Sequence, residues 1–160
     1  MSQRASPSTS PSATPEPLRK TVFVLSRNSG RELEKFIPVG QQLYAEAVKH
    51  ELTITGPIQW HYHNFVSPEA PFDLEVCLPV AEVPQEYDGQ FHVKRTDAFK
   101  SVSTVHEGSW YRIPETYKAI AMYAAANNLR LSTSSREVYI NVDLADEQGN
   151  VTEIQYGLNQ

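Results

Sequence analysis

Residues 134–142, with the sequence SSREVYINV, show the alternation of a β-strand that buries one of its faces. One face of this strand carries the apolar side chains of Val138, Ile140 and Val142. The opposite face carries Glu137, Tyr139 and Asn141. We expect helices to cover the apolar face, so that the Glu137 carboxylate and the Tyr139 phenol lie on the uncovered face of a sheet.

The chain contains a weak internal repeat, with an offset of about 77 residues between its two halves. At this offset Tyr62 aligns with Tyr139, and Trp60 becomes the counterpart of Glu137. Sequence identity between the halves is low, and the order of the predicted elements is the stronger indication of a repeat. If the halves fold alike, all four of these side chains point to the same face.

Each half is predicted to run strand, helix, strand, strand. The predicted strands are 21–26, 58–65 and 72–80 in the first half, 98–106, 136–142 and 151–158 in the second, and 91–95 between them. Helices are predicted at 36–52 and 113–129, where Pro38 and Pro114 suit a first-turn position. Each helix must bury its apolar stripe against one face of a mostly antiparallel sheet, which predicts an α+β fold.

The composition is that of a globular protein preceded by a polar tail. The chain has 160 residues, a net charge of -5 and a single cysteine. The acidic balance argues against a nucleic-acid binder, and the lone Cys77 excludes an intrachain disulfide framework. Residues 1–19 are rich in Ser and Pro and are predicted to be a disordered tail, with the domain at 20–160 and its repeat halves at about 20–80 and 90–158.

Other candidate groups are interpreted as structural. His61 and His63 form a His-x-His pair, but no further ligands follow at familiar spacings, so neither a metal nor a cofactor is predicted. We expect both histidines to point toward the helices, opposite to Tyr62. Cys77 is interpreted as a buried structural thiol, and Glu75 as a sheet-surface or hydrogen-bonded structural acid.

Several stretches of the chain together match the pattern of a known family. They are VHEGSWYRIPETYKAI at 105–120, REVYI at 136–140, TEIQYGL at 152–158, and the hairpin-like pair at 56–65 and 72–80. In this order and spacing they resemble the GyrI-like superfamily, which includes effector-binding domains of AraC-type and multidrug-responsive transcription regulators. The resemblance covers residues 20–158. No helix-turn-helix precedes it here, which implies a stand-alone member, and Trp110 replaces the tyrosine of the family's turn.

The resemblance implies two β-α-β-β units related by a pseudo-two-fold axis, with two main helices on one face of the sheet and a ligand cleft on the other. In family members that bind lipophilic cations, the residue that matches Glu137 is the buried acid that faces the positive charge of the ligand. Combined with the repeat, this predicts a ligand site formed by Glu137, Tyr139, Trp60, Tyr62 and Trp110. Aromatic walls with one acid suit a flat or cationic organic molecule.

We therefore expect a cytoplasmic bacterial protein that binds or sequesters small amphipathic aromatic or cationic molecules, without direct contact with nucleic acid or membrane. One alternative is a hydrolase of a small strained metabolite such as a cyclopropanoid, in which Glu137 is the catalytic acid or base. A further alternative, implied by the family's gyrase-inhibiting members, is an interaction protein with gyrase as its partner. Binder and hydrolase would use the same residues, so the sequence leaves both open.

Overall fold

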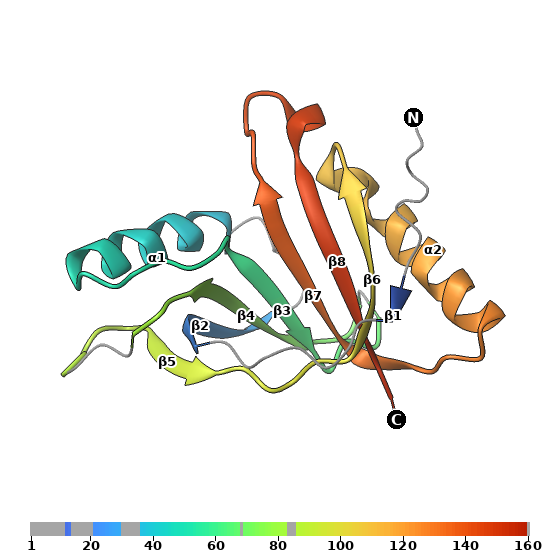
Figure 1. The fold of residues 1–160 in the computed structure, drawn as a ribbon, viewed down its shortest axis with the longest axis horizontal. Coiled ribbons are helices and arrows are strands. Elements are labelled where there is room, and N and C mark those ends of the chain that lie inside the picture. The colour runs from blue at the N-terminus through green and yellow to red at the C-terminus, as the bar shows by residue number, and fades with distance from the viewer. Residues whose placement is uncertain (1–11, 14–20, 30–35, 68, 83–85, 160) are drawn as a thin grey trace. The chain divides into compact units, whose positions relative to one another are not determined.

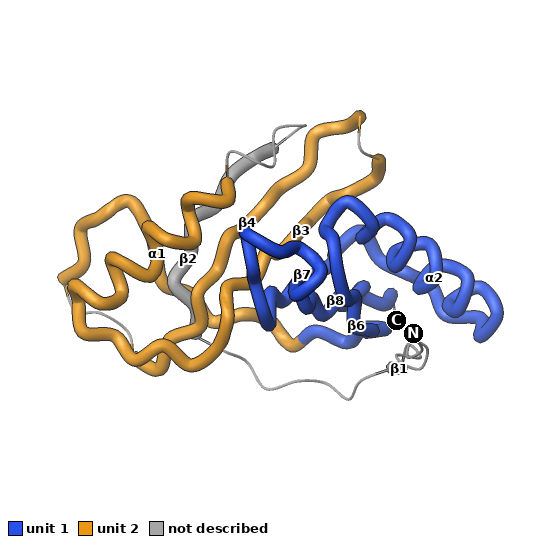
Figure 2. Tube along the Cα trace, turned by 90° about the horizontal axis from the view of Figure 1, so that it is seen from above, with its two compact units in different colours: residues 1–17, 99–160 blue, residues 18–98 orange. Residues whose placement is uncertain are grey.

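The structure is a computed structural model, and it describes residues 12–13, 21–29, 36–67, 69–82 and 86–159. The chain divides into two compact units, coloured separately in Figure 2. Unit 2 is Leu18–Ala98, and unit 1 combines Met1–Pro17 with Phe99–Gln160. Each unit contains one long helix and a set of antiparallel strands (Figure 1).

Unit 2 follows the predicted order of elements. It contains β2 (Thr21–Ser29), α1 (Ile37–Lys49), β3 (Gln59–His63), β4 (Phe72–Pro79) and β5 (His92–Arg95). The strands pair antiparallel in the order β3-β4-β2-β5. Helix α1 packs against β4 and fully buries Leu43 and Ala47. On β4 the side chains of Leu74, Val76 and Leu78 are also fully buried.

Unit 1 also contains the order strand, helix, strand, strand, and a short strand precedes it. It contains β1 (Ser12–Ala13), β6 (Ser101–Glu107), the short helix η2 (Trp110–Arg112), α2 (Ile113–Ala126), β7 (Leu131–Asn141), the short helix η3 (Glu147–Gly149) and β8 (Val151–Leu158). The strands pair antiparallel in the order β1-β6-β8-β7. Val102, Ile113, Ile120 and Ile154 form the core between this sheet and α2.

Local sequence explains where the helices begin and end. Pro38 and Pro114 occupy the first turns of α1 and α2, where a missing backbone N–H costs no hydrogen bond. After α2 the backbone turns at Asn128, which has a positive φ of 55°. Asparagine tolerates this left-handed conformation better than most residues. No helix in the described part of the chain has both the length and the hydropathy that crossing a lipid bilayer requires.

The predicted α+β class is confirmed, and the predicted helices and strands of both halves are present with shifted ends. The pseudo-two-fold relation between the halves stays a prediction. The disordered tail at 1–19 stays a prediction; within it, Ser12–Ala13 pairs with β6. The remainder of 1–19 lies outside the described residues.

Candidate functional site

Glu137 accepts hydrogen bonds from two tyrosines. It lies in β7 and is 6% exposed. The hydroxyl of Tyr139 donates to Glu137 Oε1 at 2.5 Å, and the hydroxyl of Tyr117, from α2, donates to Oε2 at 2.7 Å. The ring of Trp110 meets the ring of Tyr139 edge-on, with 5.6 Å between centroids. We call these four residues the Glu137 cluster. Because an ionised carboxylate only accepts hydrogen bonds, the two phenols are complementary to it.

The face on which Glu137 lies differs from the prediction. The pairing of β7 with β8 sets Glu137 opposite Ile154, and opposed residues of antiparallel strands project from the same face. Ile154 belongs to the core that includes Ile120 of α2. Glu137 therefore lies on the side covered by α2, and the prediction that helices cover the Val138 and Ile140 face is wrong. Ile140 is 51% exposed.

The turn before α2 fixes the position of Trp110. The Oγ atom of Ser109 accepts a hydrogen bond from the backbone N–H of Tyr111 at 3.2 Å and so caps η2. The ring of His106 bridges this turn and the helix, with Nε2 2.8 Å from the Ser109 carbonyl oxygen and Nδ1 2.8 Å from Thr116 Oγ1. The turn that carries Trp110 is thus attached to α2 and β6 by hydrogen bonds of His106.

Two buried polar atoms beside the Glu137 cluster have no hydrogen-bond partner among the described residues. They are Nε1 of Trp110 and Oγ1 of Thr152. Thr152 lies directly opposite Tyr139 in the β7–β8 pairing. Both residues are neighbours of Tyr139, Trp110 by ring contact and Thr152 by strand pairing, and buried polar groups of this kind are normally hydrogen-bonded.

Sequence reasoning missed Tyr117 and Ser135. The Tyr117 hydroxyl lies 3.4 Å from Ser135 Oγ as well as within hydrogen-bonding distance of Glu137. A signal for Tyr117 was available, because it falls on the apolar stripe of α2 between Ile113 and Ile120. A phenol in that position must find a buried acceptor on the facing sheet.

The predicted site residues divide between the two units. Glu137, Tyr139 and Trp110 come together in unit 1, whereas Trp60 and Tyr62 lie in unit 2 and are 9% and 8% exposed. A Cβ atom added to Gly40 of α1 would lie 3.5 Å from the side chain of Ile58, which alternates in phase with Trp60. This contact indicates that Trp60 and Tyr62 also lie on a helix-covered face. Their part in ligand binding stays a prediction.

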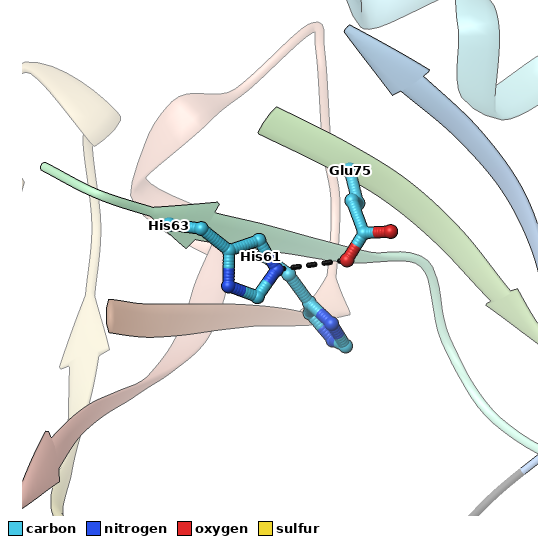
Figure 3. Close-up of side chains that lie close together, drawn as sticks. All are labelled: His61, His63 and Glu75. Atoms are coloured by element: carbon cyan, nitrogen blue, oxygen red, sulfur yellow. Dashed lines mark hydrogen bonds and ion pairs between the residues drawn. The ribbon is translucent and has the colours of Figure 1, made fainter. Parts of the chain in front are cut away.

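A second group of chemically active side chains lies on the other face of β3 and β4. His61 and His63 alternate with Tyr62, so the prediction that they point toward the helices is wrong. Glu75 pairs directly with His61 across the strands. One ligand atom from each of the three residues lies within 4.8 Å of the others (Figure 3). We call these three residues the His61 cluster.

Hydrogen bonds and an ion pair connect the His61 cluster to its neighbours. His63 Nε2 is 2.8 Å from Glu75 Oε1, and His61 Nε2 is 2.8 Å from Gln59 Oε1. Lys94 donates to both carboxylate oxygens, at 2.8 and 2.6 Å. Burial raises the pKa of Glu75, but hydrogen bonds and charge from His63 and Lys94 outweigh burial and lower that pKa from 4.5 to about 2. Glu75 is therefore hydrogen-bonded and buried, which agrees with the second of the two alternatives predicted for it, a sheet-surface or a hydrogen-bonded structural acid.

Residues 41–157 match the model of the GyrI-like small molecule binding domain. The match spans more than half of the chain, and the chain belongs to this family of small-molecule binding domains. Comparison with the sequences of curated proteins gives no match.

Solved structures of related fold include a regulator domain, a hydrolase and a cation complex. The EcmrR C-terminal domain has a TM-score of 0.77 and 23% identity, over 94% of this chain and 98% of that one. A hydrolase encoded by lin2189 from Listeria innocua has a TM-score of 0.70 and 13% identity, over 98% and 95%. SAV2435 bound to tetraphenylphosphonium has a TM-score of 0.62 and 12% identity, over 93% of each chain. At these identities the similarity shows the fold alone.

Proposed function

We propose that this small-molecule binding domain takes amphipathic aromatic cations, and that the Glu137 cluster supplies the counter-charge and the ring contacts. The buried Glu137 carboxylate, held by the hydroxyls of Tyr117 and Tyr139, is the observation that carries the proposal. A carboxylate in a partly desolvated place attracts a cation more strongly than one in water. The domain would then act as an effector-binding or sequestering protein.

The aromatic members of the cluster support the cationic part of the proposal. The faces of tryptophan and tyrosine rings attract organic cations, and the edge-to-face pair of Trp110 and Tyr139 lies next to the acid. A protein of the same fold, SAV2435, is known as a complex with tetraphenylphosphonium, a lipophilic aromatic cation. The unpartnered Nε1 of Trp110 adds a donor that suits a ligand carrying a hydrogen-bond acceptor.

Titration of tryptophan emission tests the role of Glu137. Tetraphenylphosphonium should quench the tryptophan fluorescence saturably. Glu137→Gln should weaken the binding of tetraphenylphosphonium by more than about tenfold, or about 1.4 kcal/mol. Neutral triphenylphosphine oxide should lose much less affinity in the same variant. The matched control is Glu115→Gln, which changes an acid on α2 that is 67% exposed. Trp60→Phe leaves Trp110 as the only tryptophan and assigns the signal.

Equal affinity of wild type and Glu137→Gln for the cation, with both proteins folded by circular dichroism, would refute the role given to Glu137. The hydrolase alternative is separated from binding by turnover. Incubation with a cyclopropanoid substrate followed by chromatography would reveal a product only if the protein is an enzyme, and Glu137→Gln would then abolish product formation.

A further inference from the structure

The His61 cluster contains the donor atoms of a transition-metal site. We propose that His61, His63 and Glu75 bind a divalent metal ion of the zinc type in exchange for the Lys94 ammonium group. This site lies in unit 2 and depends on none of the residues of the Glu137 cluster. The metal-site proposal can therefore be tested independently of the proposed function.

The strand geometry brings the three donors to one place. His61 and His63 are two residues apart on β3 and so project from the same face, and Glu75 is the direct partner of His61 on β4. In a tetrahedral site with bonds of about 2.0–2.1 Å, neighbouring donor atoms lie about 3.3 Å apart. The three donors already lie within 4.8 Å of one another, close to the spacing that a tetrahedral site requires.

The chemistry of the donors selects the kind of metal. Two imidazoles and one carboxylate suit zinc and its neighbours in the first transition row, whereas magnesium and calcium prefer oxygen donors alone. Three protein ligands leave a fourth position open for water or a small molecule, as in catalytic rather than structural zinc sites. His61 Nε2 is 2.8 Å from Gln59 Oε1, so a metal bound through Nδ1 of His61 would leave this contact in place as an outer hydrogen bond that orients the ring.

Lys94 occupies the position beside Glu75 in which a metal ion would supply positive charge. Its ammonium group lies 2.6 and 2.8 Å from the two oxygens of Glu75, so in the structure it balances the charge that a metal would balance. The Lys94 side chain is 38% exposed and can turn into water when a dication takes its place. His61, which is 1% exposed, keeps the inner end of the cluster shielded from solvent.

The decisive test measures zinc affinity in variants that remove a ligand or the competing cation. The chain is prepared without a polyhistidine tag, treated with chelator and titrated calorimetrically with zinc chloride. His63→Ala and Glu75→Gln should each weaken binding by more than about tenfold, and Lys94→Met should tighten it by about tenfold. The matched control, His92→Asn on β5, changes an exposed histidine outside the cluster and should bind zinc as the wild type does.

Cobalt(II) gives an independent readout, because a tetrahedral site with nitrogen and oxygen ligands produces visible absorption bands that His63→Ala should remove. The proposal is overturned if zinc binds equally to wild type and His63→Ala, which would place the metal elsewhere. It is also overturned if neither the wild type nor Lys94→Met binds zinc. Circular dichroism identifies a variant that fails to fold. If Glu75→Gln does not fold, the zinc affinities of His63→Ala and Lys94→Met still test the proposal.

Discussion

Glu137 and Glu75 are both buried carboxylates, and they have different kinds of hydrogen-bond partners. Glu137 accepts hydrogen bonds from the neutral hydroxyls of Tyr117 and Tyr139, whereas Glu75 is paired with the charged Lys94. The ion pair of Glu75 with Lys94 contributes to the pH dependence of folding, because it lowers the pKa of the Glu75 carboxyl group.

The depressed pKa of Glu75 predicts loss of stability in acid. The unfolded chain takes up a proton at Glu75 near pH 4.5, whereas the folded protein does so only near pH 2. The contribution of Glu75 is therefore fully present above about pH 4.5 and disappears as the pH falls toward 2. It amounts to at most about 3 kcal/mol.

Urea unfolding at several pH values between 7 and 2, in the presence of chelator, checks this prediction. The wild type should lose more stability below pH 4.5 than Glu75→Gln does. Glu69→Gln, a change at an exposed acid in the same unit, should follow the wild type. Parallel curves for wild type and Glu75→Gln would show that the ion pair with Lys94 does not set the acid dependence.

At the scale of elements, the hydrogen bond from Tyr117 to Glu137 joins α2 to β7 across the helix–sheet layer. Tyr117→Phe removes the donor but keeps the ring, which packs edge-on against Tyr156 with 5.8 Å between centroids. We expect a loss of about 1–3 kcal/mol in the free energy of unfolding, because a buried acceptor loses a partner. Denaturant unfolding measures it, with Tyr111→Phe, at a residue that is 83% exposed, as the control.

Hydrogen exchange distinguishes a local effect from a global one. If Tyr117 joins α2 to the sheet, Tyr117→Phe should raise amide exchange in α2 more than in β6. An unchanged free energy of unfolding together with unchanged exchange in α2 would contradict the prediction.

The positions of helices and strands followed from sequence periodicity, whereas the face of β7 did not. The apolar side chains of Val138 and Ile140 suggested that their face meets the helix. The pattern of β8 was more informative, because Ile154 and Tyr156 share one face and the β7–β8 pairing then assigns Glu137 to it. Strand alternation separates two faces but does not say which one a helix covers.

The His61 cluster escaped sequence reasoning for a related reason. His61 and His63 are visible as a His-x-His pair, but Glu75 becomes their neighbour only through the pairing of β3 with β4. Spacing rules for metal sites describe ligands that are close in the chain. A ligand from a paired strand requires the register, which depends on the loop between the strands.

At the scale of the whole molecule, one pairing of the N-terminal segment is described. Strand β1 pairs with Val102 and Ser103 and so covers part of the outer edge of β6. An uncovered strand edge offers unpaired N–H and C=O groups to other chains. We therefore expect β1 to reduce association through this sheet edge.

Two deletions test this protective role. Removal of residues 1–11 should leave the thermal midpoint and the solubility unchanged, because the Ser/Pro-rich composition adds no packed core. Removal of residues 1–13 eliminates β1 as well and should increase light scattering on prolonged incubation. Equal scattering by the two shortened chains would show that β1 does not protect the edge.

The burial of Cys77 makes its thiol a probe of local opening in unit 2. This cysteine is the only thiol of the chain, and its side chain is fully buried in β4. A thiol reagent can reach it only when the surrounding structure opens. The rate of Cys77 modification therefore measures how often the structure around β4 opens, without any label or added cysteine.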